Sequence, residues 1–458
     1  MFFGRLSLRV ASLLIICGIC MFCSAKVGAE SEKPMTTPEE AEAFIELLFS
    51  DNPASLDGMY ELASDMEKAV ISSGGWGALA KQLSSLGEAG EIGPAYADTW
   101  NGGDVLRVPC VFSAFPVDLV FVLEDGAIAG LITDKFTGER EENSEETQGG
   151  PFTEVDLSVP VPDLNGELPG TLTIPEGEGP FPVVILVHGS GPNNRDEEIM
   201  NVKPFKDLAA GLAESGIAVY RYDKRTYVYG AEMASDPQVT LMEETIEDAA
   251  AAVQVICGQD KIDPGKIIVL GHSLGAMSIP AIDRQLQGEA VKAAGYVLMA
   301  PSARNLDELM REQYEFLLSM QPEIIEEQKE EKEKLFSELD RLHNLEELQD
   351  NEQIGGAFVP YWKWLDEYEP LKEADSIEVP CLLLQGEEDY QVTMEDFHLW
   401  EEAIGTKSNW KLISYKGLVH AFIPGQKEEG STVYLKDEHV DSQVIRDIAD
   451  FVRGIQGN

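Results

Sequence analysis

Residues 266–276 read KIIVLGHSLGA, an apolar run that leads directly into the pattern G-x-S-x-G at 271–275. The pattern alone is common, but here a predicted strand precedes it and a helix-compatible stretch follows it. That strand–turn–helix setting is what a nucleophile elbow requires. The two glycines leave room for a sharp turn, and the helix N-terminus favours negative charge that develops on the serine. The stretch therefore predicts Ser273 as a nucleophile.

A serine nucleophile needs a neighbouring base, and histidine is the usual one. His420 follows the predicted strand WKLISY by a short loop, which places it at the carboxyl edge of a parallel sheet, where ligands bind. His439 is the alternative, although it begins the last predicted helix and can cap or pack there. His188 is expected to orient the glycine-rich turn that follows it, and His272 is adjacent to the nucleophile. We therefore predict His420 as the base.

The third member of such a triad is an acid that holds the imidazole in one tautomer and stabilises its charged form. Asp389 follows the predicted strand CLLLQG by a short turn and lies upstream of His420 in the sequence. The resulting chain order, Ser–Asp–His, is the order that accompanies an elbow of this kind. Glu387 and Glu388 are the neighbouring alternatives to Asp389.

A tetrahedral intermediate also needs backbone donors that face its oxyanion. One predicted donor is the N–H of Leu274, directly after the nucleophile. The other comes from the turn HGSGP at 188–192, which follows the apolar strand FPVVILV. There we favour the N–H of Ser190, with Gly191 as the second choice. The turn does not match a phosphate-binding loop, because the motif GK[ST] does not follow it.

The chain has 458 residues, which suggests more than one folded unit. Residues 36–136 combine helical periodicity with extended runs and read as a small α+β domain. The charged, glycine-ended segment 137–150 reads as a linker. Residues 151–458 alternate strands with helices, which indicates an α/β domain with a mostly parallel sheet. Within it, the charged helical block 302–370 interrupts the alternation and is expected to form a cap over the site.

Aromatic residues close this cap segment. Tyr361, Trp362 and Trp364 lie in the run VPYWKWLDEY. They can form either the apolar core of the cap or the wall of a substrate pocket, and the sequence leaves both interpretations open.

The first 29 residues have the features of an export signal. Arg5 and Arg9 precede the apolar run ASLLIICGICMFCSA, which is short for a membrane span. We expect residues 1–29 to direct export and to be cleaved, with no stable membrane insertion afterwards. The alternative is an uncleaved N-terminal anchor.

The remaining cysteines, Cys110, Cys257 and Cys381, are odd in number and far apart in apolar contexts. They suggest buried free thiols rather than disulfides or a metal site, and we expect neither a metal nor a cofactor.

The net charge is −48, from 34 Lys and Arg against 82 Asp and Glu. A surface this acidic repels phosphate backbones, so we expect no nucleic-acid partner, and it also disfavours a polyanionic substrate. Solubility of an exported protein accounts for the excess of acid.

Several segments together resemble a known group of proteins. These are HGSGPNNRDE (188–197), RYDKRT (221–226), GHSLGA (271–276), LLLQGEEDYQVT (382–393) and KGLVHAF (416–422). They are similar to the exported bacterial α/β-hydrolases of the dienelactone-hydrolase-like group, which are typically esterases with an NTF2-like domain before the hydrolase. The resemblance covers about residues 36–458.

The resemblance implies hydrolysis of small acyl esters through an acyl-enzyme intermediate on Ser273, with Asp389 and His420 as its partners. It also implies that the pocket floor is shaped by Arg221, Asp223, Lys224 and Arg225. Ala276 departs from the group, which often carries a glycine there. A peptidase or thioesterase on the same triad is the alternative, because fold does not fix substrate, and a non-catalytic binding protein is a further one. The first domain is expected to be a binding or docking module.

Overall fold

The computed structural model describes residues 33–50, 53–56, 59–63, 76, 89–100, 103–112, 116–124, 126–135, 151–321, 324 and 326–455. The expected signal segment 1–29 and the expected linker 137–150 lie outside these residues. The chain divides into two compact units, one ending at Glu146 and the other beginning at Thr147.

The first unit is an antiparallel sheet with a helix packed on it. Its strands follow the order β1-β3-β4-β5, and β2 also pairs with β3. The elements are α2 (Pro38–Leu48), the 3-10 turn η1 (Pro53–Leu56), β1 (Ala89–Ile92), β2 (Tyr96–Trp100), β3 (Gly103–Phe112), β4 (Pro116–Glu124) and β5 (Ala127–Lys135). This unit is the small α+β domain that the sequence predicts.

Local sequence explains why α2 begins where it does. Thr37 and Glu40 form a capping box, and Pro38 occupies the first helical position, where its missing N–H costs nothing. The buried face of the helix then packs on the sheet, with the ring of Phe44 in edge contact with Phe121 at 5.1 Å between centroids.

The second unit is built on an eight-stranded sheet with the order β17-β16-β13-β12-β10-β11-β9-β6. The strands from β11 to β17 pair in parallel, whereas β9 and β6 run antiparallel to their neighbours. The sheet strands are β6 (Phe152–Asp156), β9 (Gly170–Pro175), β10 (Phe181–Val187), β11 (Ala218–Tyr222), β12 (Ile262–His272), β13 (Gly295–Met299), β16 (Cys381–Gly386) and β17 (Trp410–Tyr415).

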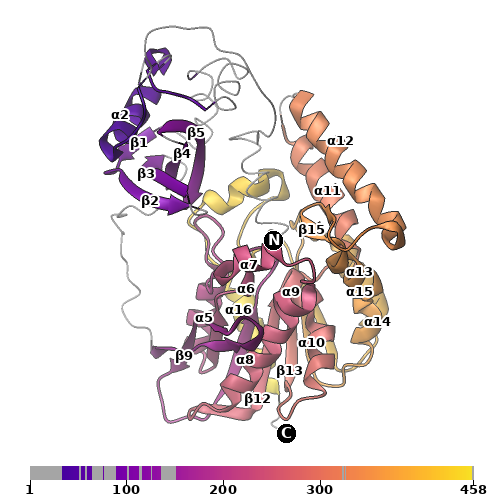
Figure 1. The fold of residues 1–458 in the computed structure, drawn as a ribbon. Helices are drawn as coiled ribbons and strands as arrows, with labels where there is room; N and C mark the ends of the chain where they lie inside the picture. The colour runs from indigo at the N-terminus through magenta and orange to yellow at the C-terminus, as the bar shows by residue number, and fades with distance from the viewer. Residues whose placement is uncertain are drawn as a thin grey trace. The chain divides into compact units, whose positions relative to one another are not determined.

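Helices cover both faces of this sheet (Figure 1). Side chains of β10 alternate between two cores: Val183 and Ile185 join the core that contains α8 and α10, and Val184 joins the core that contains α5 and α16. Burial on both faces explains why the parallel strands read as continuous apolar runs. The helices of this unit outside the cap are α5 (Pro204–Glu214), α6 (Arg225–Val228), α7 (Gly230–Ser235), a π-helical turn η4 (Met242–Ile246), α8 (Glu247–Cys257), α9 (Leu274–Met277), α10 (Ile279–Leu286), α15 (Met394–Ile404) and α16 (Ser442–Gly454), with two 3-10 segments, η3 (Pro162–Leu164) and η6 (Lys427–Leu435).

The antiparallel edge is a difference from the sequence prediction, which expects alternation of strands and helices from residue 151 onward. Besides β6 and β9, a separate hairpin forms from β7 (Val159–Val161) and β8 (Gly166–Leu168). These strands are three to six residues long, and a proline lies inside β7 and at the end of β9, so they give a weaker strand signal than the long apolar runs of the parallel strands.

The cap segment lies between β13 and β16. It contains α11 (Leu306–Ser319), α12 (Glu326–Asp340), the 3-10 segment η5 (Arg341–Glu347), β14 (Gln353–Ile354), β15 (Ala357–Phe358), α13 (Val359–Glu367) and α14 (Pro370–Ala374). Tyr361 and Trp362 are each 4% exposed and belong to the apolar core of the second unit. Trp362 donates a hydrogen bond to the carbonyl of Ile354, and the partly buried Trp364 packs on the same core. These contacts favour the core interpretation of the aromatic cluster.

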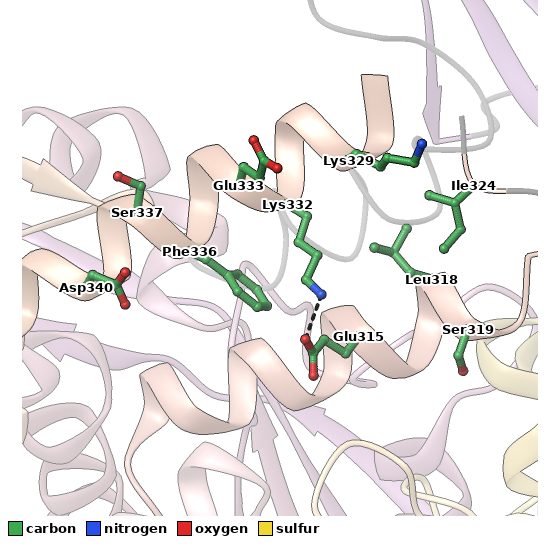
Figure 2. Close-up of a pocket in the computed structure, with 10 residues that line it drawn as sticks. All are labelled: Glu315, Leu318, Ser319, Ile324, Lys329, Lys332, Glu333, Phe336, Ser337 and Asp340. Atoms are coloured by element: carbon green, nitrogen blue, oxygen red, sulfur yellow. Dashed lines mark hydrogen bonds and ion pairs between the residues drawn. The ribbon is translucent and has the colours of Figure 1, made fainter. Parts of the chain in front are cut away.

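A groove of about 570 Å³ runs between the first two cap helices, α11 and α12. Figure 2 shows Leu318 and Phe336 along it, and Lys332 bridges it to Glu315 at 2.7 Å. No residue predicted for the site lines this groove.

Among the described residues, the three cysteines are free, and Cys110 and Cys381 are buried as predicted, whereas Cys257 is only half-buried. Within the same residues, no helix is both long enough and apolar enough to cross a bilayer.

Candidate active site

The elbow predicted around Ser273 is a strained turn between β12 and α9. Ser273 has φ 54° and ψ −117°, a conformation that costs a non-glycine residue about 1 to 3 kcal/mol. A Cβ on Gly271 would lie 2.3 Å from the Gly275 carbonyl oxygen, and one on Gly275 would lie 2.3 Å from the Val187 carbonyl oxygen. Only glycine fits at either position, which is the close approach that the sequence pattern predicts.

Asp389 and His420 lie side by side although 31 residues separate them in the chain. Nδ1 of His420 is 2.6 Å from Oδ2 of Asp389, and both side chains are buried. Asp389 follows β16 and His420 follows β17, which are adjacent parallel strands, so both emerge at the same edge of the sheet. Because a carboxylate only accepts, Nδ1 carries the proton and Nε2 is left as the basic nitrogen.

Three further groups hold the Asp389 carboxylate in place. Its Oδ1 accepts the backbone N–H groups of Gln391 at 2.7 Å and Val392 at 3.0 Å. Its Oδ2 also accepts Nε2 of Gln385 at 3.1 Å. Sequence reasoning missed Gln385; the available signal was an amide side chain inside the otherwise apolar strand CLLLQG.

The remaining histidines have other partners. His439, the alternative base, is largely exposed and lies 3.0 Å from Asp207. His188 is buried and contacts the carbonyl oxygen of Asn194 at 3.0 Å, which is consistent with its expected role in orienting the turn. Burial lowers the pKa of His188 to about 4.

Ser273 itself is joined to His420 only indirectly. Its neighbour His272 lies against the His420 ring, with 4.7 Å between ring centroids. The Ser273 hydroxyl makes no hydrogen bond to any residue that the structure describes. Such bonds are often long in ligand-free sites and tighten when substrate binds. The structure thus brings Asp389 to His420, and both to the edge of the sheet where the elbow lies.

The turn HGSGP lies directly against the elbow. A Cβ on Gly189 would be 3.2 Å from the Ser273 Cβ. The backbone N–H groups of Ser190 and Leu274, the predicted oxyanion donors, are bonded to no other described residue. Gly189 N–H, in contrast, is already bonded to Glu197 at 2.6 Å, and so this N–H cannot serve.

A buried ion pair between Lys224 and Glu244 also contacts this turn. Nζ of Lys224 donates to the Gly189 carbonyl oxygen at 2.7 Å and to Glu244 at 2.7 Å. Burial raises the pKa of Glu244, but Lys224 and Tyr361 act in the opposite direction, and the pKa is lowered overall. Sequence reasoning missed both Glu244 and Glu197, because each becomes close to the turn only through the tertiary fold.

The other residues that the resemblance assigns to the pocket floor form ion pairs. Arg221 pairs with Glu154 at 2.6 Å, and Asp223 pairs with Arg195 at 2.8 Å. Arg225 forms a buried pair with Asp248 at 2.5 Å. Of this group, Lys224 is the residue for which the structure records a contact with the turn beside the nucleophile.

Known proteins are similar to this chain in sequence. Residues 179–426 match the model of a family described as serine aminopeptidase, S33. A relative, Esterase EstD of Thermotoga maritima, is 35% identical over 416 residues, which cover 90% of this chain and 94% of that protein. The chain belongs to the serine aminopeptidase S33 family. The S33 match includes Ser273, Asp389 and His420, and the predicted α/β-hydrolase fold is confirmed.

The similarity of this S33 chain to EstD is longer than the stretch from Thr147 to the end, so it extends into the first unit. Solved structures are more distant. Est1E of Butyrivibrio proteoclasticus is 17% identical with a TM-score of 0.41, covering 64% of this chain and 99% of that one. A puromycin-hydrolysing peptidase of Mycobacterium tuberculosis is 16% identical with a TM-score of 0.44, covering 77% and 46%.

Proposed function

We propose that this chain is a serine esterase that hydrolyses carboxylic esters of small acyl groups. The observation that carries the proposal is the 2.6 Å contact between Asp389 and His420 at the sheet edge that also bears the strained Ser273 elbow. A strained serine beside an acid–histidine pair is the arrangement that activates a hydroxyl for acyl transfer. The relative named as an esterase supports ester bonds as the target.

In the proposed mechanism, Nε2 of His420 removes the proton from Ser273 Oγ as the oxygen attacks the ester carbonyl carbon. The resulting oxyanion accepts hydrogen bonds from the N–H groups of Ser190 and Leu274. The intermediate collapses to an acyl-enzyme, and the alkoxide leaves with the proton that His420 returns. Water then repeats the sequence on the acyl-enzyme, which releases the carboxylic acid. Asp389 keeps the imidazole in the required tautomer throughout.

Ser273→Ala tests the proposal directly. We expect kcat for a chromogenic acetate ester to fall about 10⁶-fold, because alanine lacks the oxygen that would form the acyl-enzyme. Ser235→Ala, at the end of α7, is the matched control and should retain wild-type turnover. Turnover near wild type in Ser273→Ala would reject the triad and leave the idea of a non-catalytic binding protein or a different site.

An aminopeptidase is the second candidate, and the description of the family favours it. A panel of acyl esters, acyl thioesters and aminoacyl anilides of rising chain length separates the candidates. We expect kcat/KM for short esters to exceed that for anilides by more than about 100-fold; the reverse order would assign the triad to peptide bonds.

We also propose an NTF2-like binding or docking role for the first unit, and export directed by residues 1–29. The helix-on-sheet architecture of that unit and its inclusion in the similarity to EstD support the first idea, and the sequence pattern supports the second. If export with cleavage occurs, intact-mass measurement of secreted protein will give a chain that starts near residue 30. A full-length mass would favour an uncleaved anchor.

A further inference from the structure

Glu197 is a buried carboxylate that none of the proposed chemical steps uses. It lies in the loop after the HGSGP turn and is 2% exposed. Its backbone has φ 51°, in the left-handed region that costs a non-glycine residue about 1 kcal/mol or more. A strained backbone that carries a buried charge needs strong contacts to persist, and those contacts lead to two parts of the candidate site.

The first contact is with the turn beside the nucleophile. Oε1 of Glu197 accepts the Gly189 N–H at 2.6 Å, while Lys224 holds the Gly189 carbonyl oxygen from the other side at 2.7 Å. Both polar groups of Gly189 are therefore anchored. Since Ser190 follows Gly189 directly, these two bonds set the direction in which the Ser190 N–H points.

The second contact is with the histidine before the nucleophile. Oε2 of Glu197 lies 2.9 Å from Nδ1 of His272, and Nε2 of His272 lies 3.0 Å from the His420 carbonyl oxygen. Nε2 of His272 is within hydrogen-bonding distance of the His420 carbonyl oxygen, and Nδ1 makes an ion-pair contact with Glu197, a combination that suits an imidazolium. Burial lowers the pKa of His272, but Glu197, the His420 carbonyl oxygen and Asp389 together raise it overall.

The same balance applies to the carboxylate. Burial raises the pKa of Glu197, and the opposing effects of His272, His188 and the Gly189 N–H lower it overall. Further ionisable groups that act electrostatically on these side chains, among the residues that the structure describes, are Lys224, Asp223, Asp389 and Tyr434.

We propose that Glu197 is a positioning residue that fixes the oxyanion turn and the His420 backbone in position relative to each other. Through Gly189 it orients the Ser190 N–H, and through His272 it fixes the segment from which the His420 ring reaches Asp389. The donors and the base belong to segments far apart in the chain, and one carboxylate links both. This inference rests on the proposed esterase function.

The test compares Glu197→Ala with Glu197→Gln by steady-state hydrolysis of p-nitrophenyl acetate. In the alanine variant both links are lost, and a displacement of about 1 Å in a catalytic group costs about 100-fold, so we expect kcat to fall about 100-fold with KM nearly unchanged. Glutamine can still accept from Gly189 and can donate to Nδ1 of a neutral His272. We therefore expect the glutamine variant to recover at least about tenfold of the lost kcat.

Glu198→Ala is the matched control, because Glu198 is the next residue and its side chain contacts Asn194 and Lys203 instead. It should keep kcat within about twofold of wild type. Urea unfolding of each variant, followed by tryptophan fluorescence, gives the folded fraction to which kcat is normalised. If Glu197→Ala does not fold, His272→Phe takes its place: it keeps a ring beside His420, loses the bond to the His420 carbonyl and should lower kcat to a similar extent.

The inference is overturned if normalised kcat of Glu197→Ala, or of His272→Phe in its place, stays near wild type. A rise in KM with kcat unchanged, or a glutamine variant as impaired as the alanine variant, overturns it as well. Ser273→Ala, measured in the same series, distinguishes failure of the esterase proposal from failure of the positioning role. An active Ser273→Ala rejects the esterase mechanism itself, whereas an inactive Ser273→Ala beside an unimpaired Glu197→Ala rejects only the positioning role.

Discussion

Replacing Asp389 with asparagine changes the hydrogen bonding at one end of the proposed triad while keeping its shape. Four donors surround the carboxylate: two backbone N–H groups at Oδ1, and Gln385 and His420 at Oδ2. An asparagine side chain has a single acceptor oxygen. The two backbone donors cannot turn away, so the oxygen is expected to stay with them and the NH₂ to face Gln385 and His420.

The consequence for His420 follows from that orientation. An NH₂ donor opposite Nδ1 favours the tautomer in which Nδ1 accepts and Nε2 carries the proton, so Nε2 can no longer remove the proton from Ser273. The equivalent exchange in a serine protease triad lowers kcat about 10⁴-fold, and we expect a loss of that order here. The donor pair formed with Gln385 should also cost about 1 to 3 kcal/mol of unfolding free energy.

The assay is kcat for p-nitrophenyl acetate at neutral pH, with urea unfolding measured alongside. Glu388→Gln is the matched control, because it makes the same chemical change one residue earlier and should leave kcat within about twofold of wild type. A kcat for Asp389→Asn within about tenfold of wild type would refute the tautomer argument. If Glu388→Gln loses most of its activity instead, the triad acid is Glu388 and the assignment to Asp389 is wrong.

Two further predictions concern the elbow and the response to pH. Gly275→Ala should destabilise the protein by at least about 3 kcal/mol, because its Cβ would lie 2.3 Å and 2.6 Å from the carbonyl oxygens of Val187 and His188; Gly230→Ala, with open space around it, should leave the thermal midpoint unchanged, and equal midpoints for both variants would contradict the steric argument. Between about pH 6.5 and pH 4, His188 gains a proton when the protein unfolds, so the free energy of unfolding should fall as the pH drops through this range. In His188→Phe, the urea midpoint of unfolding should depend less steeply on pH. An unchanged slope would show that His188 does not bind protons differently in the two states.

Local pattern accounts for much of the fold. Continuous apolar runs such as FPVVILV and CLLLQG predict buried parallel strands, because both faces of the sheet are covered and neither needs polar residues. The elbow at 271–275 can also be predicted from the sequence, since only glycine at position 275 tolerates the approach of the Val187 carbonyl oxygen. The sequence did not predict the antiparallel strands β6 to β9, because they are only three to six residues long and none forms a continuous apolar run.

Some candidate site residues can be predicted from the sequence, and others are found only in the tertiary structure. Chain order and position after a strand are sufficient to nominate Ser273, Asp389 and His420, since these are one-dimensional features. The tertiary structure adds a reason to prefer His420 over His439: His420 is buried against Asp389, whereas His439 is exposed beside Asp207. Glu197, 76 residues before the nucleophile, carries no motif that reveals its contact with His272.

The sequence by itself determined which segments form the parallel strands and the helices between them, and therefore which turns end at the carboxyl edge of the sheet. Only the tertiary structure decided which polar groups meet there. The physical reason is that periodicity reports burial along one element, whereas a hydrogen bond depends on two elements whose distance apart no local pattern encodes.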